Sequence, residues 1–139
     1  MNYDDLTRLI IGAAIEVHRL LGPGLLESAY EECLAHELAI RNVNHRRQVP
    51  VPVVYKGVKL ECGYRMDLVV EERVVVELKA IESIAPVHEA TMLTYLRLSD
   101  KTLGLLINFN VSILKDGVRR FVLKHPIECG ELRGVRRER

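Results

Sequence analysis

YRMDLVVEERVVVELKAI, residues 64–81, is the stretch of sequence from which the fold follows. Its apolar residues alternate with polar ones on both sides of a charged segment at 71–73, and a period of two predicts two antiparallel strands joined by a turn. Along the second strand every even-numbered residue is apolar, whereas the odd-numbered face carries Glu77 and Lys79. The first strand places Asp67 on its polar side. We therefore expect one face of this hairpin to enter a core and the other to meet water or a cleft.

The two carboxylates of this hairpin share a face in only one register. Asp67 lies opposite Glu77 if Val70 pairs with Val74, which requires a three-residue loop at 71–73. A two-residue turn would place the acids on opposite faces, because a slip of one residue reverses every side chain. Three-residue loops usually carry glycine at the left-handed position, and this one has none. From spacing alone, the simplest interpretation is a solvated strand face with a weak Glu–Lys pair.

The rest of the chain predicts helices and further strands around this hairpin. Gly22-Pro23-Gly24 separates the first two helices, of which the second is expected to bury Leu26. A third helix is expected to bury Val87. The expected elements are a helix from its N-cap Asp4 to about Leu21, a helix from Leu25 to about Arg41, an irregular edge strand at 48–55, a strand at 58–62, the hairpin itself, a helix from Pro86 to about Leu98, a doubly buried strand at 102–109, and a strand at 118–123 after an Asp116-Gly117 hairpin turn.

This order predicts an α/β class domain, a single sandwich with a central mixed β-sheet flanked by helices, rather than repeated βαβ units. We expect the domain to span residues 1–125 and the basic segment 126–139 to be a flexible tail. With 48% hydrophobic and 28% charged residues, the composition excludes a disordered chain. No apolar run approaches the roughly 20 residues of a membrane span, and the N-terminus does not resemble a signal peptide, so we expect a cytoplasmic protein with no membrane partner.

Cysteine usage and charge narrow the function classes further. The three cysteines are far apart and form no C-x-x-C, which favours reduced thiols over a structural zinc site. A formal net charge of +1 neither favours nor excludes a nucleic-acid partner. Trp is absent and Phe is scarce, so the composition argues against aromatic stacking on single strands.

Two of the expected helices carry polar residues that suit a cleft. Glu27 falls in the first turn of the second helix, where an acid also complements the helix dipole, and Tyr30 one turn later is expected to be a half-buried aromatic. On the third helix His88, Thr91 and Tyr95 recur at helical spacing, apart from the apolar side. This polar stripe suits a cleft wall, although a lone histidine on a helix is more often a surface or core residue.

Taken in order, several segments resemble a known family. Gly24-Leu-Leu-Glu27-Ser-Ala-Tyr30 matches the Gly-x-x-Glu-x-x-Tyr signature of the small GxxExxY proteins. The segments that follow in the family's order are Tyr55-Lys-Gly57, Asp67, Glu77-Leu-Lys79, His88-Glu-Ala, Tyr95-Leu and Gly104-Leu-Leu-Ile-Asn-Phe109. The resemblance covers roughly residues 6–123. These proteins are grouped with the PD-(D/E)XK nuclease superfamily, so the resemblance implies its restriction-endonuclease-like fold.

The resemblance also implies a metal-dependent nuclease site. In this superfamily one strand carries an Asp and the next a Glu-x-Lys, and a preceding helix often adds a Glu. Asp67, Glu77 and Glu27 would then be catalytic metal-site acids, with the Leu78 carbonyl as a further ligand, and Lys79 would be the catalytic lysine. The implied cation is Mg²⁺, with Mn²⁺ as a substitute. The implied substrate contacts are Tyr30, Gln48, His88, Thr91 and Tyr95, although Thr91 stands where a Gln is expected.

Electrostatics gives an independent expectation for such a site. Two carboxylates about 4 Å apart repel by roughly 4 kcal/mol at an effective dielectric of 20. If Glu27 joins Asp67 and Glu77, we expect either a bound cation or a raised pKa.

Three functions therefore compete. The favoured one is a Mg²⁺-dependent nuclease that acts on DNA or RNA, with DNA the favoured substrate. The second is a catalytically silent nuclease-like fold that binds nucleic acid or protein. The third is an interaction protein whose exposed edge near Gln48–Tyr55 pairs with another chain, a homodimer included.

Overall fold

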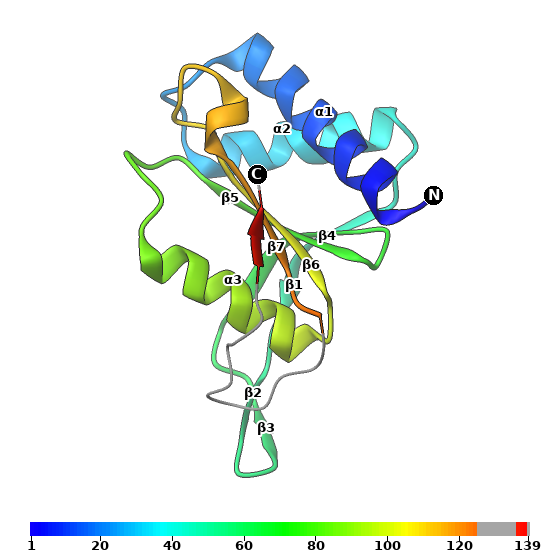
Figure 1. The fold of residues 1–139 in the computed structure, drawn as a ribbon, viewed down its shortest axis with the longest axis vertical. Helices are drawn as coiled ribbons and strands as arrows, with labels where there is room; N and C mark the ends of the chain where they lie inside the picture. The colour runs from blue at the N-terminus through cyan, green and yellow to red at the C-terminus, as the bar shows by residue number, and fades with distance from the viewer. Residues whose placement is uncertain (125–135, 139) are drawn as a thin grey trace.

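The computed structural model of the chain describes residues 1–124 and 136–138. They form a mixed sheet with helices on both faces, so the predicted α/β sandwich is confirmed (Figure 1). The elements are α1 (Tyr3–Leu21), α2 (Glu27–Ile40), β1 (His45–Pro50), β2 (Val53–Tyr55), β3 (Val58–Leu60), β4 (Arg65–Val70), β5 (Val74–Lys79), α3 (Pro86–Ser99), β6 (Leu103–Asn108), the 3₁₀ turn η1 (Leu114–Gly117), β7 (Val118–Val122) and β8 (Arg136–Glu138).

The main sheet has the strand order β1-β4-β5-β6-β7-β8. Strands β5 and β6 are parallel and are connected through α3, whereas the other neighbouring pairs are antiparallel. Strands β2 and β3 form a separate hairpin that projects below the body in Figure 1. Strand β1 lies at the edge of the main sheet, as Pro50 predicted, but the single strand expected at 48–55 is divided between β1 and β2, which belong to different sheets.

The central hairpin takes the register that brings its acids together. Val70 pairs with Val74, so the loop is the three-residue segment 71–73. In place of the usual glycine, Glu71 and Glu72 both adopt left-handed backbone conformations, with φ of 52° and 56°. The side chain of Glu72 accepts two hydrogen bonds from Arg46 on β1, at 2.6 and 2.8 Å. The loop therefore uses a backbone conformation that glutamate seldom adopts, with its side chain held against β1.

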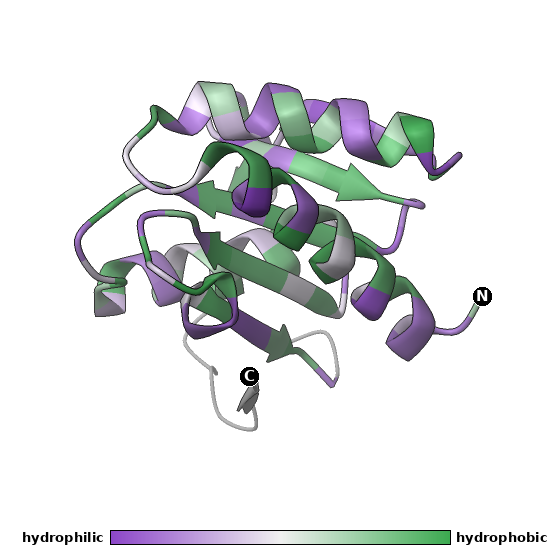
Figure 2. Ribbon diagram, turned by 90° about the horizontal axis from the view of Figure 1, so that it is seen from above, coloured by the Kyte–Doolittle hydropathy of each residue, from purple (hydrophilic) through white to green (hydrophobic). Residues whose placement is uncertain are grey.

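Two hydrophobic cores lie on opposite faces of the sheet. The larger core joins α1 and α2 to residues such as Leu68, Val76 and Leu78. The smaller core joins α3 to residues such as Val69 and Val75. Helix α3 therefore covers the hairpin face that we expected to meet water or a cleft, leaving a cleft only at one end. Figure 2 shows the consequence, with mostly apolar strands in the middle and hydrophilic helix faces outside.

Several predicted helix details are wrong. The N-cap of α1 is Asn2 rather than Asp4, because the Asn2 side chain accepts a hydrogen bond from the Asp5 N–H at 2.8 Å. Helix α2 begins at Glu27, and Leu26 is 77% exposed because it precedes the helix in an extended conformation. Val87 is 64% exposed. Helix α3 buries Met92, Tyr95 and Leu96 instead, so its polar stripe borders the sheet.

The connections also differ from expectation in places. Asp116 and Gly117 belong to η1 rather than to a hairpin turn, and Gly117 packs so closely on the Asn108 carbonyl that a Cβ atom would clash there. The predicted tail 126–139 lies largely outside the described residues, although 136–138 form β8. Among the described cysteines, Cys33 and Cys62 are free. In the part of the chain that the structure describes, no helix has the length and apolar character needed to cross a membrane.

Candidate active site

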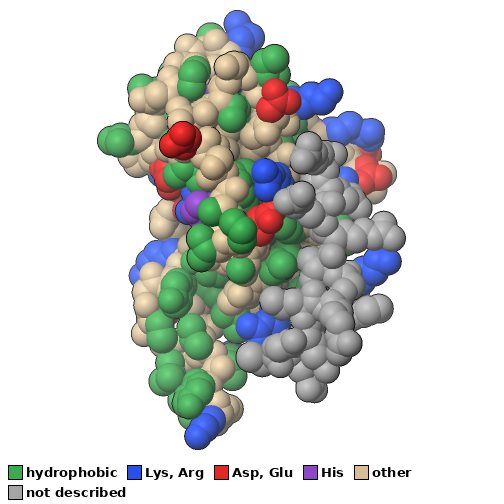
Figure 3. Space-filling model, turned by 60° about the vertical axis from the view of Figure 1, so that its left-hand side comes forward, with side chains coloured by type: hydrophobic (Ala, Val, Ile, Leu, Met, Phe, Trp, Pro, Cys, Tyr) green, Lys and Arg blue, Asp and Glu red, His purple; other side chains and the backbone are tan. Residues whose placement is uncertain are grey.

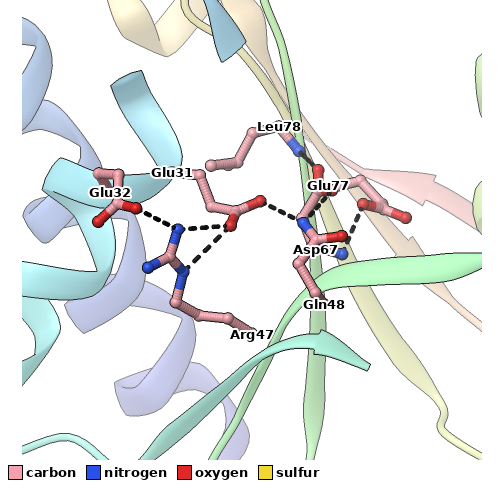
Figure 4. A network of polar contacts seen from close by, with 7 residues as sticks. All are labelled: Glu31, Glu32, Arg47, Gln48, Asp67, Glu77 and Leu78. Atoms are coloured by element: carbon pink, nitrogen blue, oxygen red, sulfur yellow. Dashed lines mark hydrogen bonds and ion pairs between the residues drawn. The ribbon is translucent and has the colours of Figure 1, made fainter. Parts of the chain in front are cut away.

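Two carboxylates meet where β4 and β5 run side by side. The backbone N–H of Asp67 donates a hydrogen bond to Glu77 Oε2 at 3.1 Å, and the N–H of Leu78 donates one to Asp67 Oδ2 at 2.8 Å (Figure 4). Each acid is thus held by a backbone donor on the other strand. The register of the hairpin creates this arrangement, because it places residue 67 opposite residue 77.

Close approach of the two acids changes the proton affinity of Glu77. This side chain is only 7% exposed. Burial, reinforced by repulsion from Asp67, raises the pKa of the Glu77 carboxyl to about 9, and nearby Lys79 offsets only part of the effect. At neutral pH Glu77 is therefore protonated in the metal-free protein.

The acids open into a small cleft of about 120 Å³ between the sheet, α3 and the start of α2. Seven sequence-predicted residues line it, from four different elements. The lining comprises Glu27, Arg65, Asp67, Glu77, Lys79, His88, Thr91, Met92, Tyr95 and Leu106. Sequence reasoning missed Arg65, Met92 and Leu106. The structure thus brings the Asp and the Glu-x-Lys together with the helix Glu in one cavity.

Glu27 nevertheless stands apart from the acid pair. Among residues 1–124 and 136–138, no group of three His, Cys, Asp or Glu side chains is close enough to hold one metal ion. Only Asp67 and Glu77 are in direct contact, so the three-acid cluster considered from the sequence is not assembled. Glu27 borders the cleft as a further negative charge at its α2 wall.

The polar stripe of α3 forms the opposite wall. His88 Nδ1 accepts a hydrogen bond from the Ala85 N–H at 2.8 Å, and the Thr91 hydroxyl donates one to the Val87 carbonyl at 2.9 Å. Tyr95 is 9% exposed. Burial, together with the nearby carboxylates of the acid pair, raises the pKa of the Tyr95 phenol. The wall therefore offers a neutral phenol and an imidazole whose Nδ1 is already engaged.

Tyr30 does not belong to this cleft, which corrects the prediction that it contacts substrate. It is completely buried and stacks on Phe109, with 4.4 Å between the ring centroids. Its hydroxyl donates to the Gly22 carbonyl at 2.6 Å and accepts from the Leu25 N–H at 3.2 Å. Tyr30 thus fixes the turn that precedes Glu27. The three-residue spacing between Glu27 and Tyr30 therefore reflects support of this turn.

Gln48 contacts Asp67 from β1 (Figure 4) and is not among the residues that line the cleft. Its backbone has a left-handed φ of 51°, unusual within a strand. The side-chain Nε2 donates to Glu31 Oε1 at 2.6 Å and makes a long contact of 3.5 Å with Asp67 Oδ1. Glu31 is buried, and Arg47 donates to its Oε2 from two nitrogens, at 2.8 and 3.1 Å. A chain of polar contacts therefore runs from Arg47 to Asp67.

The sequence analysis did not identify Glu31 and Arg47 as members of the polar chain that reaches Asp67. A signal was present, because Glu31 shares the buried side of α2 with Leu34, Ala35 and Leu38. A glutamate in such a position requires a partner, since burying an unpaired charge is costly. That partner comes from β1, and the sequence does not show which strand packs against α2.

Comparison with known proteins gives one match. A family model described as the PD-(D/E)XK nuclease superfamily matches residues 4–121. This confirms the superfamily that the sequence resemblance indicated, and the matched range contains all the residues lining the cleft. No curated protein and no solved structure matches the chain.

Proposed function

The chain belongs to the PD-(D/E)XK nuclease superfamily, and from this premise we propose that it hydrolyses phosphodiester bonds in the cleft at Asp67 and Glu77 with a divalent cation. A nuclease superfamily implies a nucleic-acid substrate. The observation that carries the proposal is the pair of facing carboxylates, of which Glu77 is buried, with Lys79 in the same cleft. A pair that is unfavourable when fully ionised suits a site that gains its counter-charge from a ligand.

The residues present fit a hard divalent cation. Carboxylate oxygens are its preferred protein ligands, and Mg²⁺ typically keeps several waters and takes only one or two carboxylates. Asp67 and Glu77 supply this set, with the Leu78 carbonyl proposed as a further ligand. Glu27, outside direct contact with the pair, would act through a water. We propose Mg²⁺ as the cation and Mn²⁺ as its substitute.

Each cleft residue has a role in this proposal. When bound, the cation polarises the scissile phosphate and lowers the pKa of a coordinated water. Lys79 orients the attacking water and stabilises negative charge that develops on the phosphate. His88, Thr91 and Tyr95 form the α3 wall against which the substrate backbone is positioned. Arg65 adds a second cation for phosphate at the β4 side.

The direct test of this function is cleavage of labelled DNA and RNA in Mg²⁺, compared with the same reactions in a chelator. The proposal expects products only with the cation, with DNA preferred over RNA, and it places the activity in the cytoplasm. Intact DNA and RNA strands under every condition would contradict the proposed activity.

One observation favours a second candidate, a nuclease-like fold that binds nucleic acid without cutting it. Thr91 stands where a Gln is expected, and its hydroxyl donor is used by the Val87 carbonyl. The cleft therefore lacks an amide at that wall. This candidate expects nucleic-acid binding that needs no divalent cation and survives Glu77→Gln.

Gln48 gives a prediction about how Asp67 is held. In Gln48→Ala the Asp67 carboxylate loses its side-chain neighbour, and we expect Mn²⁺ affinity to fall by about tenfold, the low end for residues that orient metal ligands. Calorimetric titration of Mn²⁺ measures this change independently of cleavage. Arg46→Ala changes another residue of β1 and removes only its exposed ion pair with Glu72 in the 71–73 loop, so it is the control with unchanged affinity. Equal affinity in wild type and a folded Gln48→Ala would contradict this role.

A further inference from the structure

A second cavity, of about 470 Å³, adjoins the cleft and extends toward the β2–β3 hairpin. We call it the hairpin groove. Val54, Tyr55 and Tyr64 line one side, and Val87, Tyr95 and Leu98 of α3 line the other. Thr91 and Tyr95 line both the groove and the cleft, so the two spaces share a wall. Figure 3 shows hydrophobic side chains gathered over the hairpin, with a basic side chain at its tip.

The hairpin groove concentrates the exposed aromatic residues of the chain. Three of the five tyrosines line it, and Tyr55 and Tyr64 are 61% and 51% exposed. Tyr64 meets the buried ring of Tyr95 edge-on, with 6.3 Å between the centroids. Flat aromatic surfaces of this kind bind nucleobases by stacking, whatever the base. Composition alone argued against stacking, but the fold gathers the few aromatic rings next to the cleft.

Charge around the groove points to an anionic occupant. No Asp or Glu lines it, and its one charged lining residue is Arg97. The Arg97 Nε atom is buried without a hydrogen-bond partner in the described part of the chain. Lys56 at the hairpin tip and Lys59 on β3 add further positive charge. A second copy docked symmetrically would bring these basic residues together, whereas a nucleic-acid strand offers both apolar bases and negative phosphates.

The sizes of the two cavities complete the argument. The cleft has room for a phosphate group and small ligands, whereas the groove lies within the range of volumes that hold drug-sized organic molecules. We propose that the hairpin groove binds unpaired bases of the strand being cut, while the adjoining phosphate enters the cleft. This inference rests on the proposed nuclease function and adds a substrate class, nucleic acid with single-stranded segments.

Fluorescence anisotropy in a chelator tests the groove, because it separates binding from cleavage. The probes are a labelled oligothymidylate and a blunt duplex of the same length. We expect the single strand to bind at least about tenfold more tightly than the duplex. Tyr55→Ala and Tyr64→Ala should each weaken single-strand binding by about tenfold. Tyr3→Ala, at an exposed tyrosine on α1, is the matched control with unchanged affinity.

Arg97→Gln tests independently whether Arg97 contacts a phosphate of the bound strand. We expect the slope of log affinity against log salt to decrease in magnitude by about 0.7, the value for one phosphate of a single strand. Thermal melting of each variant verifies that the fold is retained.

The possible outcomes distinguish failure of strand binding in the groove from failure of the proposed nuclease activity. Equal affinity for the two probes, or tyrosine variants that bind like wild type, would overturn the inference. A stable dimer that Tyr55→Ala dissociates would also overturn it, in favour of a second copy as the occupant. Strand binding that depends on the tyrosines, without any cleavage in Mg²⁺, would support the groove and reject the proposed nuclease activity.

Discussion

Lys79→Met is expected to lower metal-dependent cleavage by about 10³-fold while leaving the protein folded. The ammonium group lines the cleft beside the acid pair, and removing one donor that stabilises developing charge typically costs about 10²–10³ in rate. The loss of water orientation adds to this effect. The change should appear in the maximal rate rather than in substrate affinity, since the developing charge exists only in the transition state. Single-turnover cleavage assays measure it directly.

The control for this variant is Lys115→Met, which removes an exposed lysine in η1, outside the cleft. It should cleave at the wild-type rate. Mn²⁺ binding should persist in Lys79→Met, because a protonated amine is not a metal ligand. Cleavage by Lys79→Met within threefold of wild type would show that this lysine has no catalytic role.

Glu77→Gln is expected to stabilise the metal-free protein at alkaline pH. The pKa of Glu77 is about 9 in the folded state, above its ordinary value of 4.5. Between these pH values the folded state holds a proton that the unfolded state has released. Stability therefore falls as pH rises from 4.5 to 9, by at most about 1.4 kcal/mol per pH unit. Glutamine does not titrate, so Glu77→Gln should lack this loss, which by pH 8 amounts to at most about 5 kcal/mol.

Urea unfolding between pH 5 and 9 in a chelator measures this difference. Glu61→Gln is the matched control, because Glu61 is an exposed acid outside the cleft and should leave the wild-type slope intact. Adding Mn²⁺ should stabilise wild type most at high pH, where cation binding to the ionised acid replaces proton binding. A wild-type free energy of unfolding that stays constant over this range would contradict a buried, protonated Glu77.

The sequence predicted the fold well because its signals were local. Period-two alternation identified β4 and β5, and helical spacing identified α1 and α3. The register of the hairpin remained open in the sequence, because the usual glycine signal was missing. The structure has the three-residue loop, in which Glu71 and Glu72 are both left-handed and Glu72 pairs with Arg46 of β1. The sequence does not show this, because the residues of β1 that contact the loop lie far from it along the chain.

The sequence identified only those cleft residues that belong to a recognisable motif. Asp67, Glu77 and Lys79 follow from the strand pattern together with the family resemblance, and all three line one cavity. Tyr30 was misplaced, because its spacing from Glu27 reflects support of a turn rather than substrate contact. Gln48 was assigned to substrate, whereas its side chain contacts Glu31 and Asp67 and does not line the cleft. Motif spacing does not distinguish a residue in a cleft from one that supports it.

The amino-acid composition did not predict the hairpin groove. Tyr55, Tyr64 and Tyr95 are separated along the chain and carry no shared pattern. They meet because the β2–β3 hairpin returns beside α3. Global counts of aromatic residues therefore understate a stacking surface that tertiary structure assembles.

Calorimetric titration of Mn²⁺ into the nucleic-acid-free protein, beside Asp67→Asn and Glu77→Gln, tests the central claim most directly. Mn²⁺ replaces Mg²⁺ because it binds oxygen ligands of this type more tightly. The account predicts saturable binding to a single class of site in wild type, and binding at least about tenfold weaker in each folded variant. No saturable binding in wild type, or equal binding in all three proteins, would contradict a metal site at the acid pair.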